Sequence, residues 1–132
     1  MHKFTENIKS DAAMAWATLN NSANTPTYFS MANYDGYAFV VHTGTLTGAA
    51  SLTLQARQRI GAAGTQANLG AAVVTTTDDG LTILEGNAPD LTVNSGYDRV
   101  GILITETATA NAIVSCVLYR WKARFKQATL PS

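Results

Sequence analysis

The sequence predicts an all-β protein, a single antiparallel sandwich or barrel of about eight or nine short strands. Over most of the chain, apolar and polar residues alternate with a period of two, which is the pattern of strands that bury one face. Clusters of Gly, Asn and Asp interrupt this pattern at a spacing of roughly ten residues, as turns between short strands do. Helical patterns do not separate the strands, so a parallel sheet with crossover helices is not expected.

The N-terminal residues 10–19 fit two conformations. Ser10 would cap a helix, whereas Met14, Trp16 and Thr18 alternate with smaller residues as an extended arm would. Large apolar side chains this close to a terminus imply docking, because chain ends are usually disordered unless they are held. We expect the segment to dock on this chain's own sandwich or on a neighbouring subunit.

Two strands are clear in the first half of the domain. Residues 37–42 are β-branched and aromatic and follow a turn cluster at 33–36. After a connection bounded by glycines, residues 51–59 alternate cleanly between apolar and polar side chains. Arg57 and Arg59 fall on the polar face of this second strand. A short strand over residues 28–31 precedes both.

The second half contains the strongest turn signal of the chain. The turn 78–80, which is Asp-Asp-Gly, lies between the β-prone runs 71–76 and 81–84 and predicts a hairpin, because Asp-Gly supplies the positive φ that such turns need. A short strand over 91–93 and a longer one over 98–105 follow.

The C-terminal strand, from residue 112 to about 125, is expected to be the longest. Its first half is apolar at odd and even positions and is predicted to be buried on both faces. Its second half places aromatic residues on one side and cations on the other. Three interpretations are open: a single-stranded nucleic-acid site, an edge strand whose cations discourage pairing, and a strand that docks on an acidic protein surface. The cations are Arg120, Lys122, Arg124 and Lys126.

Composition narrows the possible functions. The 132 residues suit one domain, and nine Lys and Arg balance nine Asp and Glu. This balance argues against a general binder of nucleic acid or anionic membranes. Charged residues make up only 14%, so Thr, Ser, Asn and Gln carry much of the polar surface, as suits a protein covered by neighbours. No secretion signal or membrane-spanning run is visible, and we expect a soluble protein made in a cytoplasm.

The sequence offers little for catalysis. The single cysteine, Cys116, excludes an internal disulfide and lies in an apolar run, which predicts a buried structural thiol. His2 and His42 are too few for a histidine-based metal site. A glycosidase would need two carboxylates, but the candidates lie near predicted turns and strand ends, where solvated side chains are expected. These candidates are Glu85, Asp90, Asp98 and Glu106. We therefore predict no catalytic, cofactor-binding or metal-binding residue and no cofactor.

Residues 34–55 and 97–102 carry a resemblance to a known group of proteins. The first segment joins a Tyr-Asp pair, an apolar strand, the motif Thr-Gly-Thr-Leu-Thr-Gly at 43–48 and an alternating strand that reaches Gln55. The second segment, Tyr-Asp-Arg-Val-Gly-Ile, is similar in order. This pattern resembles small virion proteins of tailed bacteriophages, over most of residues 25–120.

The resemblance implies a jelly-roll-like β-sandwich that acts as a capsid decoration or cement protein. Such a subunit binds the outside of the capsid shell and clamps neighbouring capsid proteins, without enzymatic activity. The implied partner is the major capsid protein, and the implied location is the capsid exterior after synthesis in the host cytoplasm. We expect a homo-oligomer, a dimer or trimer, that binds neither nucleic acid nor membrane.

These expectations assign parts of the chain. We expect an N-terminal arm over residues 1–24, a sandwich over 25–126 and a tail over 127–132. The arm would supply apolar contacts to the capsid or a second subunit, and the last strand would supply electrostatic ones. The expected contact residues are Phe4, Ile8, Met14, Trp16, Arg120, Lys122 and Arg124.

Two other functions remain open at this point. One is a carbohydrate-binding module of a virion or tail, in which exposed tyrosines stack on sugar rings. The other is a tail or head-completion subunit that assembles into rings or tubes. The tyrosines available for stacking are Tyr28, Tyr34, Tyr37 and Tyr97.

Overall fold

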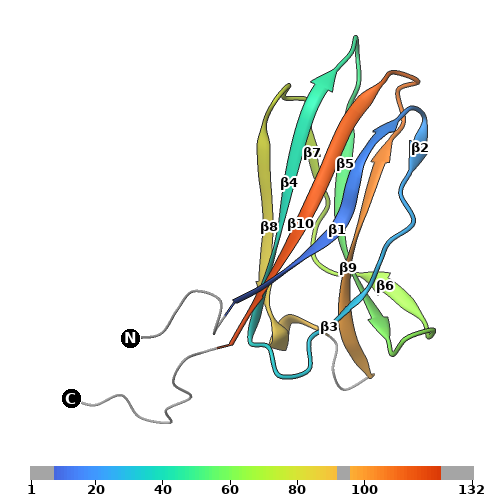
Figure 1. The fold of residues 1–132 in the computed structure, drawn as a ribbon. Helices are drawn as coiled ribbons and strands as arrows, with labels where there is room; N and C mark the ends of the chain where they lie inside the picture. The colour runs from blue at the N-terminus through green and yellow to red at the C-terminus, as the bar shows by residue number, and fades with distance from the viewer. Residues whose placement is uncertain (1–7, 92–95, 123–132) are drawn as a thin grey trace, which may run out of the picture.

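Two antiparallel sheets packed face to face make up the protein in a computed structural model that describes residues 8–91 and 96–122 (Figure 1). The sheet nearer the viewer, called the front sheet here, has four strands in the order β1-β10-β4-β8. Their bounds are Ile8–Leu19 for β1, Ala112–Trp121 for β10, Gly36–Leu46 for β4 and Leu81–Asn87 for β8.

The second sheet, called the back sheet, lies behind it and follows the order β2-β9-β5-β6. The short strand β3 also pairs with β9, and the short strand β7 also pairs with β5, so each outer column of this sheet contains two short strands. The bounds are Ser22–Ala23 for β2, Phe29–Ser30 for β3, Leu52–Ile60 for β5, Gln66–Asn68 for β6, Val73–Thr75 for β7 and Tyr97–Glu106 for β9.

The chain path is that of a jelly roll. If β2 with β3 and β6 with β7 each count as one position, the front sheet holds positions 1-8-3-6 and the back sheet holds 2-7-4-5. All pairings are antiparallel, and the connections pass repeatedly from one sheet to the other. The predicted all-β, jelly-roll-like sandwich is therefore confirmed, and a barrel is not formed.

The core lies between the sheets and is built from alternate residues of the long strands. Each fully buried aliphatic or aromatic side chain of this kind contributes about 1.5–3 kcal/mol relative to exposure. Cys116 is also fully buried in this core, which confirms the predicted buried thiol. Burial raises the pKa of this thiol to about 12. The largest of the fully buried apolar side chains are Phe39, Leu52, Leu54, Ile102, Ile104 and Leu118.

The N-terminal segment is a strand, so the helical alternative for residues 10–19 is wrong. β1 pairs along its length with β10, from Ile8 opposite Trp121 to Leu19 opposite Ala112. Two register shifts interrupt the pairing. Pairing with β10 overrides the local helical signal, because a strand at this place supplies hydrogen-bond partners to the backbone of β10, which would otherwise be the edge of the sheet. The expected arm thus includes an edge strand of the sandwich.

The Asp-Asp-Gly turn does not close a hairpin, and that prediction is wrong. β7, before the turn, pairs with β5 in the back sheet, whereas β8, after it, pairs with β4 in the front sheet. The turn therefore carries the chain from one sheet to the other. Asp79 has the positive φ of 48° that the turn signal predicted, so the local conformation was foreseen and the partner strands were not.

The last described strand is shorter and more central than expected. β10 ends at Trp121 and has 10 residues, fewer than the 12 of β1 and the 11 of β4. It lies between β1 and β4, so its interpretation as an edge strand is wrong. Residues 123–125 of the predicted strand, and 92–93 of the predicted strand before β9, lie outside the described residues.

Candidate functional site

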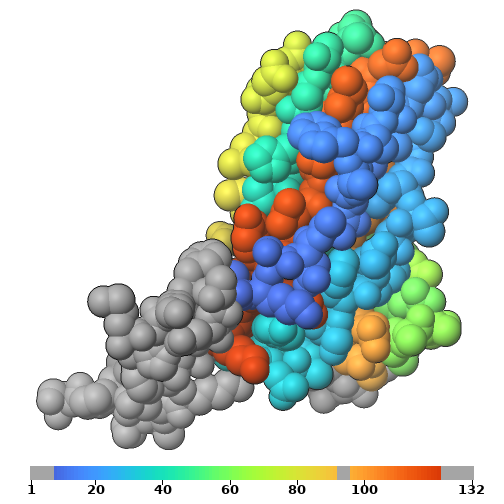
Figure 2. Space-filling model, viewed as in Figure 1, coloured from blue at the N-terminus to red at the C-terminus, as the bar shows by residue number. Residues whose placement is uncertain are grey.

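Apolar side chains gather on the outer face of the front sheet, which Figure 2 shows toward the viewer. Strand pairing sets its central row, because Val40 of β4 lies opposite Val117 of β10 on one side and Ile83 of β8 on the other. Side chains at paired positions point to the same side of a sheet. We call this surface the apolar face and define it by Trp16, Val40, Leu81, Ile83, Ile113 and Val117.

Much of the apolar face is open to solvent. The exposed fractions are 60% for Trp16, 57% for Leu81, 53% for Ile83 and 37% for Ile113. Among the outward-facing positions of the described front sheet, Glu85 is the only carboxylate, no Lys or Arg occurs, and His42 is the one histidine. A surface with few charges and several exposed apolar side chains suits contact with another protein.

Trp16 is the largest side chain of the apolar face. A Cβ placed on Gly44 of β4 would lie 3.6 Å from the Trp16 ring and 3.3 Å from the Ile113 side chain. The tryptophan therefore extends from β1 across β10 to a glycine of β4, which leaves room for it. At the other end of the sheet, the ring of Trp121 lies over Gly36 in the same manner.

A shallow hollow of about 420 Å³ lies where the two sheets open, between β8 and the β6–β7 segment. Leu69, Val73 and Ile83 contribute to its lining, together with the carboxylates Glu85 and Asp90. Ile83 belongs to both surfaces, so apolar character continues from the front sheet around this side of the sandwich.

The structure separates the expected apolar contacts. Trp16 lies on the apolar face, whereas Met14 packs against the core and is only partly exposed. Ile8 pairs with Trp121 at the far end of β1 and is partly exposed. Phe4 lies outside the described residues. These residues therefore do not form one contact among the residues described.

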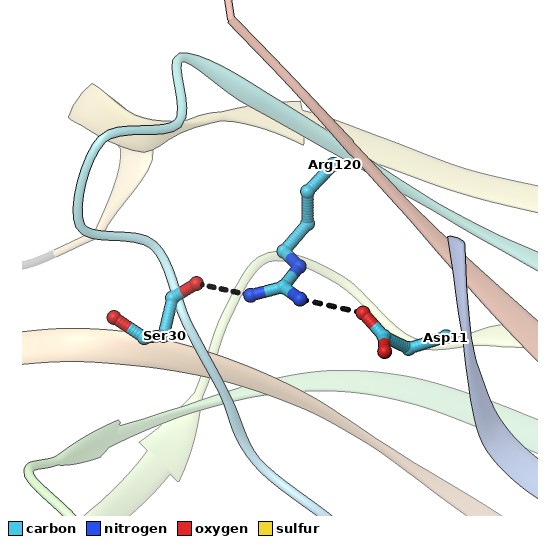
Figure 3. A network of polar contacts seen from close by, with 3 residues as sticks. All are labelled: Asp11, Ser30 and Arg120. Atoms are coloured by element: carbon cyan, nitrogen blue, oxygen red, sulfur yellow. Dashed lines mark hydrogen bonds and ion pairs between the residues drawn. The ribbon is translucent and has the colours of Figure 1, made fainter. Parts of the chain in front are cut away.

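Arg120 is buried, so the prediction that it supplies an exposed cation is wrong. Its side chain is 6% exposed and forms an ion pair of 2.5 Å with Asp11 of β1 (Figure 3). Its other terminal nitrogen donates to the carbonyl of Ser30 at 2.7 Å, and its guanidinium lies over the rings of Tyr34 and Phe29. The even positions of β10 point into the sandwich, and Arg120 joins the two sheets at this end.

Lys122 remains an exposed cation, just beyond the end of β10. Its Nζ lies 5.8 Å from the centroid of the Tyr34 ring. Arg124 lies outside the described residues. Because Arg120 is internal, the described part of the chain shows no continuous stripe of cations along this strand.

The tyrosines considered for sugar stacking do not share one exposed face. Tyr37 is buried between the sheets, where burial, with a smaller contribution from the Asp90 charge, raises its pKa to about 12. Tyr28 lies under Arg59 on the back sheet, and Tyr34 lies under Arg120.

Sequence reasoning found only Trp16 of the apolar face. Ile113 was expected to be buried because both faces of residues 112–118 are apolar, yet its side chain points outward. The sequence did contain a signal for this face, since some strands have apolar residues at both odd and even positions. In β8 these are Leu81, Ile83 and Leu84. They indicate a second covered face, and residues 8–91 and 96–122 leave much of it exposed.

The described ranges also lack a cluster of metal ligands and a helix that could span a membrane. No cluster of three or more His, Cys, Asp or Glu side chains suitable for a metal ion occurs among residues 8–91 and 96–122. None of the helical segments in that part of the chain is long and apolar enough to cross a membrane.

Comparison with known proteins identifies no family. No family model matches the chain, and no curated protein matches its sequence. Among solved structures, it is similar to a chain of the Bacillus endospore appendages, described as a novel family of disulfide-linked pili, with 17% identity over 88% of each chain and a TM-score of 0.48.

The chain is also similar to part of a chain of the infectious bursal disease virus, Gx strain. The identity is 13% over 90% of this chain, with a TM-score of 0.44. The match spans only 32% of that viral chain. Neither likeness identifies a function for this protein.

Proposed function

We propose that this protein is a non-enzymatic structural subunit of a virion, a capsid decoration or cement protein that binds the outer shell and stabilises it. The observation that carries the proposal is the apolar face. Four of its side chains, Trp16, Leu81, Ile83 and Ile113, are more than one-third exposed. Exposed apolar groups that gather on one face mark protein–protein contact sites in soluble proteins. Trp16, 60% exposed, is the proposed anchor of the contact, because tryptophan is enriched among the few residues that contribute most to binding at interfaces.

The chemistry of this face favours a protein partner. The apolar face offers no lysine or arginine to the phosphates of a nucleic acid. Its indole ring and aliphatic side chains are best buried against a complementary protein surface that excludes water. The major capsid protein is the proposed partner, because its repeated copies present the same surface many times. The resemblance of residues 34–55 to phage virion proteins supports this choice.

Attachment to the assembled shell would stabilise it by linkage. A subunit that binds the lattice better than its dissociated parts shifts the equilibrium toward assembly. We propose a dimer or trimer, since one oligomer can then engage several sites and hold a shell that single weak contacts would not. We therefore also propose a location on the capsid exterior.

Co-sedimentation with capsids that lack the protein tests the proposal. We expect saturable binding at a fixed ratio to the major capsid protein. The double variant Trp16→Ser with Ile83→Ser should bind at least tenfold more weakly, because it removes the largest side chain and one from the central row.

Val74→Ser is the matched control, because Val74 is 62% exposed but lies on the back sheet. It should bind as the wild type does. Equal loss in both variants would show that the contact is not on the apolar face. If the wild-type protein does not bind shells at all and forms rings or tubes under the electron microscope, the decoration role is wrong and a tail or head-completion role replaces it.

A further inference from the structure

Three arginines gather on the outer face of the back sheet, opposite to the apolar face. Arg57 and Arg59 belong to β5 and Arg99 belongs to β9, and Arg59 pairs directly with Arg99 across the two strands. Arg57 lies two residues along the same face, opposite Gly101. We call these three residues the arginine cluster. Together they are one-third of the nine cations of the chain.

No described carboxylate neutralises the arginine cluster. Among the described residues, none of the three arginines forms an ion pair. The Nε atoms of Arg59 and Arg99 are buried and lack a hydrogen-bond partner. Like charges placed directly opposite each other in a sheet are destabilising, and buried polar groups without partners add to this cost.

Neutral side chains hold two of the arginines in place. The guanidinium of Arg59 lies 5.1 Å from the ring centroid of Tyr28, and Tyr28 donates a hydrogen bond of 2.6 Å to Gln66. Arg57 donates to Oδ1 of Asn68 at 2.5 Å. These contacts orient the cations without cancelling their charge, so the positions are set before any ligand arrives.

We propose that the arginine cluster binds a phosphate-type oxyanion that carries two or more negative charges. Strand geometry separates Arg57 and Arg59 by about 7 Å and Arg59 and Arg99 by about 5 Å at their backbones, so three guanidinium groups can converge on one group of oxygens. Guanidinium groups donate in a planar fork that matches phosphate oxygens. A single carboxylate would leave most of the positive charge unmatched.

Ring stacking plays no part in this recognition. The guanidinium of Arg59 already lies over the Tyr28 ring. The ring also lies close to Gly101, where an added Cβ would be 2.9 Å from a ring carbon. The ligand is therefore bound by its charge and oxygens rather than by a base or sugar face. This site does not rest on the proposed capsid attachment, because it uses the opposite sheet.

Calorimetric titration of the full chain with inorganic pyrophosphate at low salt tests the proposal. We expect saturable binding to the wild type and at least tenfold weaker binding to Arg59→Gln with Arg99→Gln. The control is Lys9→Gln with Lys122→Gln, which removes the same charge from exposed cations elsewhere and should change the affinity less than twofold. The proposal would be contradicted if pyrophosphate binding to the wild type did not saturate, or if both double variants bound pyrophosphate equally weakly.

Thermal unfolding separates binding from a structural role of the arginines. Arg99→Gln should leave the midpoint of the free protein unchanged or higher, because it removes the like-charge pair. Saturating pyrophosphate should raise the wild-type midpoint by about 5 °C and the variant's by much less. A lower midpoint for the free variant, with no effect of pyrophosphate on the wild type, would show that the arginines serve only the fold.

A second titration with a sugar phosphate monoester identifies the source of the oxyanion. Tighter binding of the monoester than of inorganic phosphate would assign the site to an esterified group. Equal or weaker binding would assign it to the free ion. Failure of both, together with pyrophosphate, would contradict the proposal.

Discussion

At the scale of single residues, Glu106 is the most constrained carboxylate of the described chain. It is fully buried at the end of β9 and accepts backbone hydrogen bonds from Asn21 at 2.8 Å, Ala108 at 2.7 Å and Ala110 at 3.4 Å. These bonds, that of Asn21 foremost, lower its pKa against the opposing effect of burial. One side chain thus holds the turn after β1 and the turn after β9. The sequence predicted a solvated carboxylate here, and that prediction is wrong.

The lowered pKa of Glu106 makes stability dependent on pH. Because the pKa is lower in the folded protein, the carboxylate contributes stability above its unfolded value of about 4.5, and this contribution is lost as the pH falls toward the folded value. Glu106→Gln should therefore be less stable than the wild type at pH 7, and the difference should shrink below pH 4.5.

Urea unfolding of Glu106→Gln and the wild type, at pH 7 and at a pH below 4.5, measures the difference in their free energies of unfolding. The control is Glu85→Gln, an exposed carboxylate on β8, which should change stability little at either pH. A constant deficit for Glu106→Gln at all pH values would show that shape rather than charge decides its role.

At the scale of elements, side-chain hydrogen bonds explain why the loop between β7 and β8 connects the two sheets instead of closing a hairpin. Asp78 accepts a hydrogen bond of 2.8 Å from the backbone N–H of Leu46. Thr43 donates to the carbonyl of Thr77 at 2.8 Å and accepts from the N–H of Gly80 at 2.9 Å. These bonds tie the loop to β4 of the front sheet, so β8 begins there and does not fold back on β7.

Removing the Asp78 side chain should loosen this crossing. Asp78→Ala removes an acceptor for a backbone N–H and should lower the free energy of unfolding by about 1 kcal/mol. Hydrogen exchange should become faster at the amide of Leu46, which loses its partner.

Asp79→Asn is the control for this variant, because Asn tolerates the positive φ at that position and the bond from its backbone N–H to Gly44 is kept. It should leave exchange at Leu46 unchanged. Protection of Leu46 that survives Asp78→Ala would show that the backbone contacts alone hold the loop.

At the scale of the whole molecule, the two sheets present different outer faces. The outer face of the front sheet has several exposed apolar side chains and a single carboxylate among its described residues, whereas that of the back sheet carries the arginine cluster. The residues of these faces come from different strands and are separated by the buried core. The two proposed contacts can therefore be made at the same time.

Independence of the faces is itself testable. The variant Trp16→Ser with Ile83→Ser should bind pyrophosphate with wild-type affinity, and Arg59→Gln with Arg99→Gln should attach to capsids as the wild type does, because effects at distant sites add. Calorimetry and co-sedimentation of both variants check this. If each variant lost both activities, a shared folding defect would explain the losses, and circular dichroism would reveal it.

The local pattern alone determined the all-β class, the inward residues of the long strands, the buried Cys116 and the positive φ of Asp79. Each of these depends on neighbours within a few residues, through strand alternation or turn conformation. The local pattern also marked Trp16 as an unusual apolar residue, but not where its ring would lie.

The tertiary structure alone decided which strands are neighbours, and therefore what the side chains face. Arg120 is internal because β1 places Asp11 beside it, 109 residues away in the chain. The apolar face and the pair of Arg59 with Arg99 likewise depend on register between strands that are distant in sequence. Such register is set by the packing of the whole sandwich, because a shift of one residue would turn every side chain to the other face.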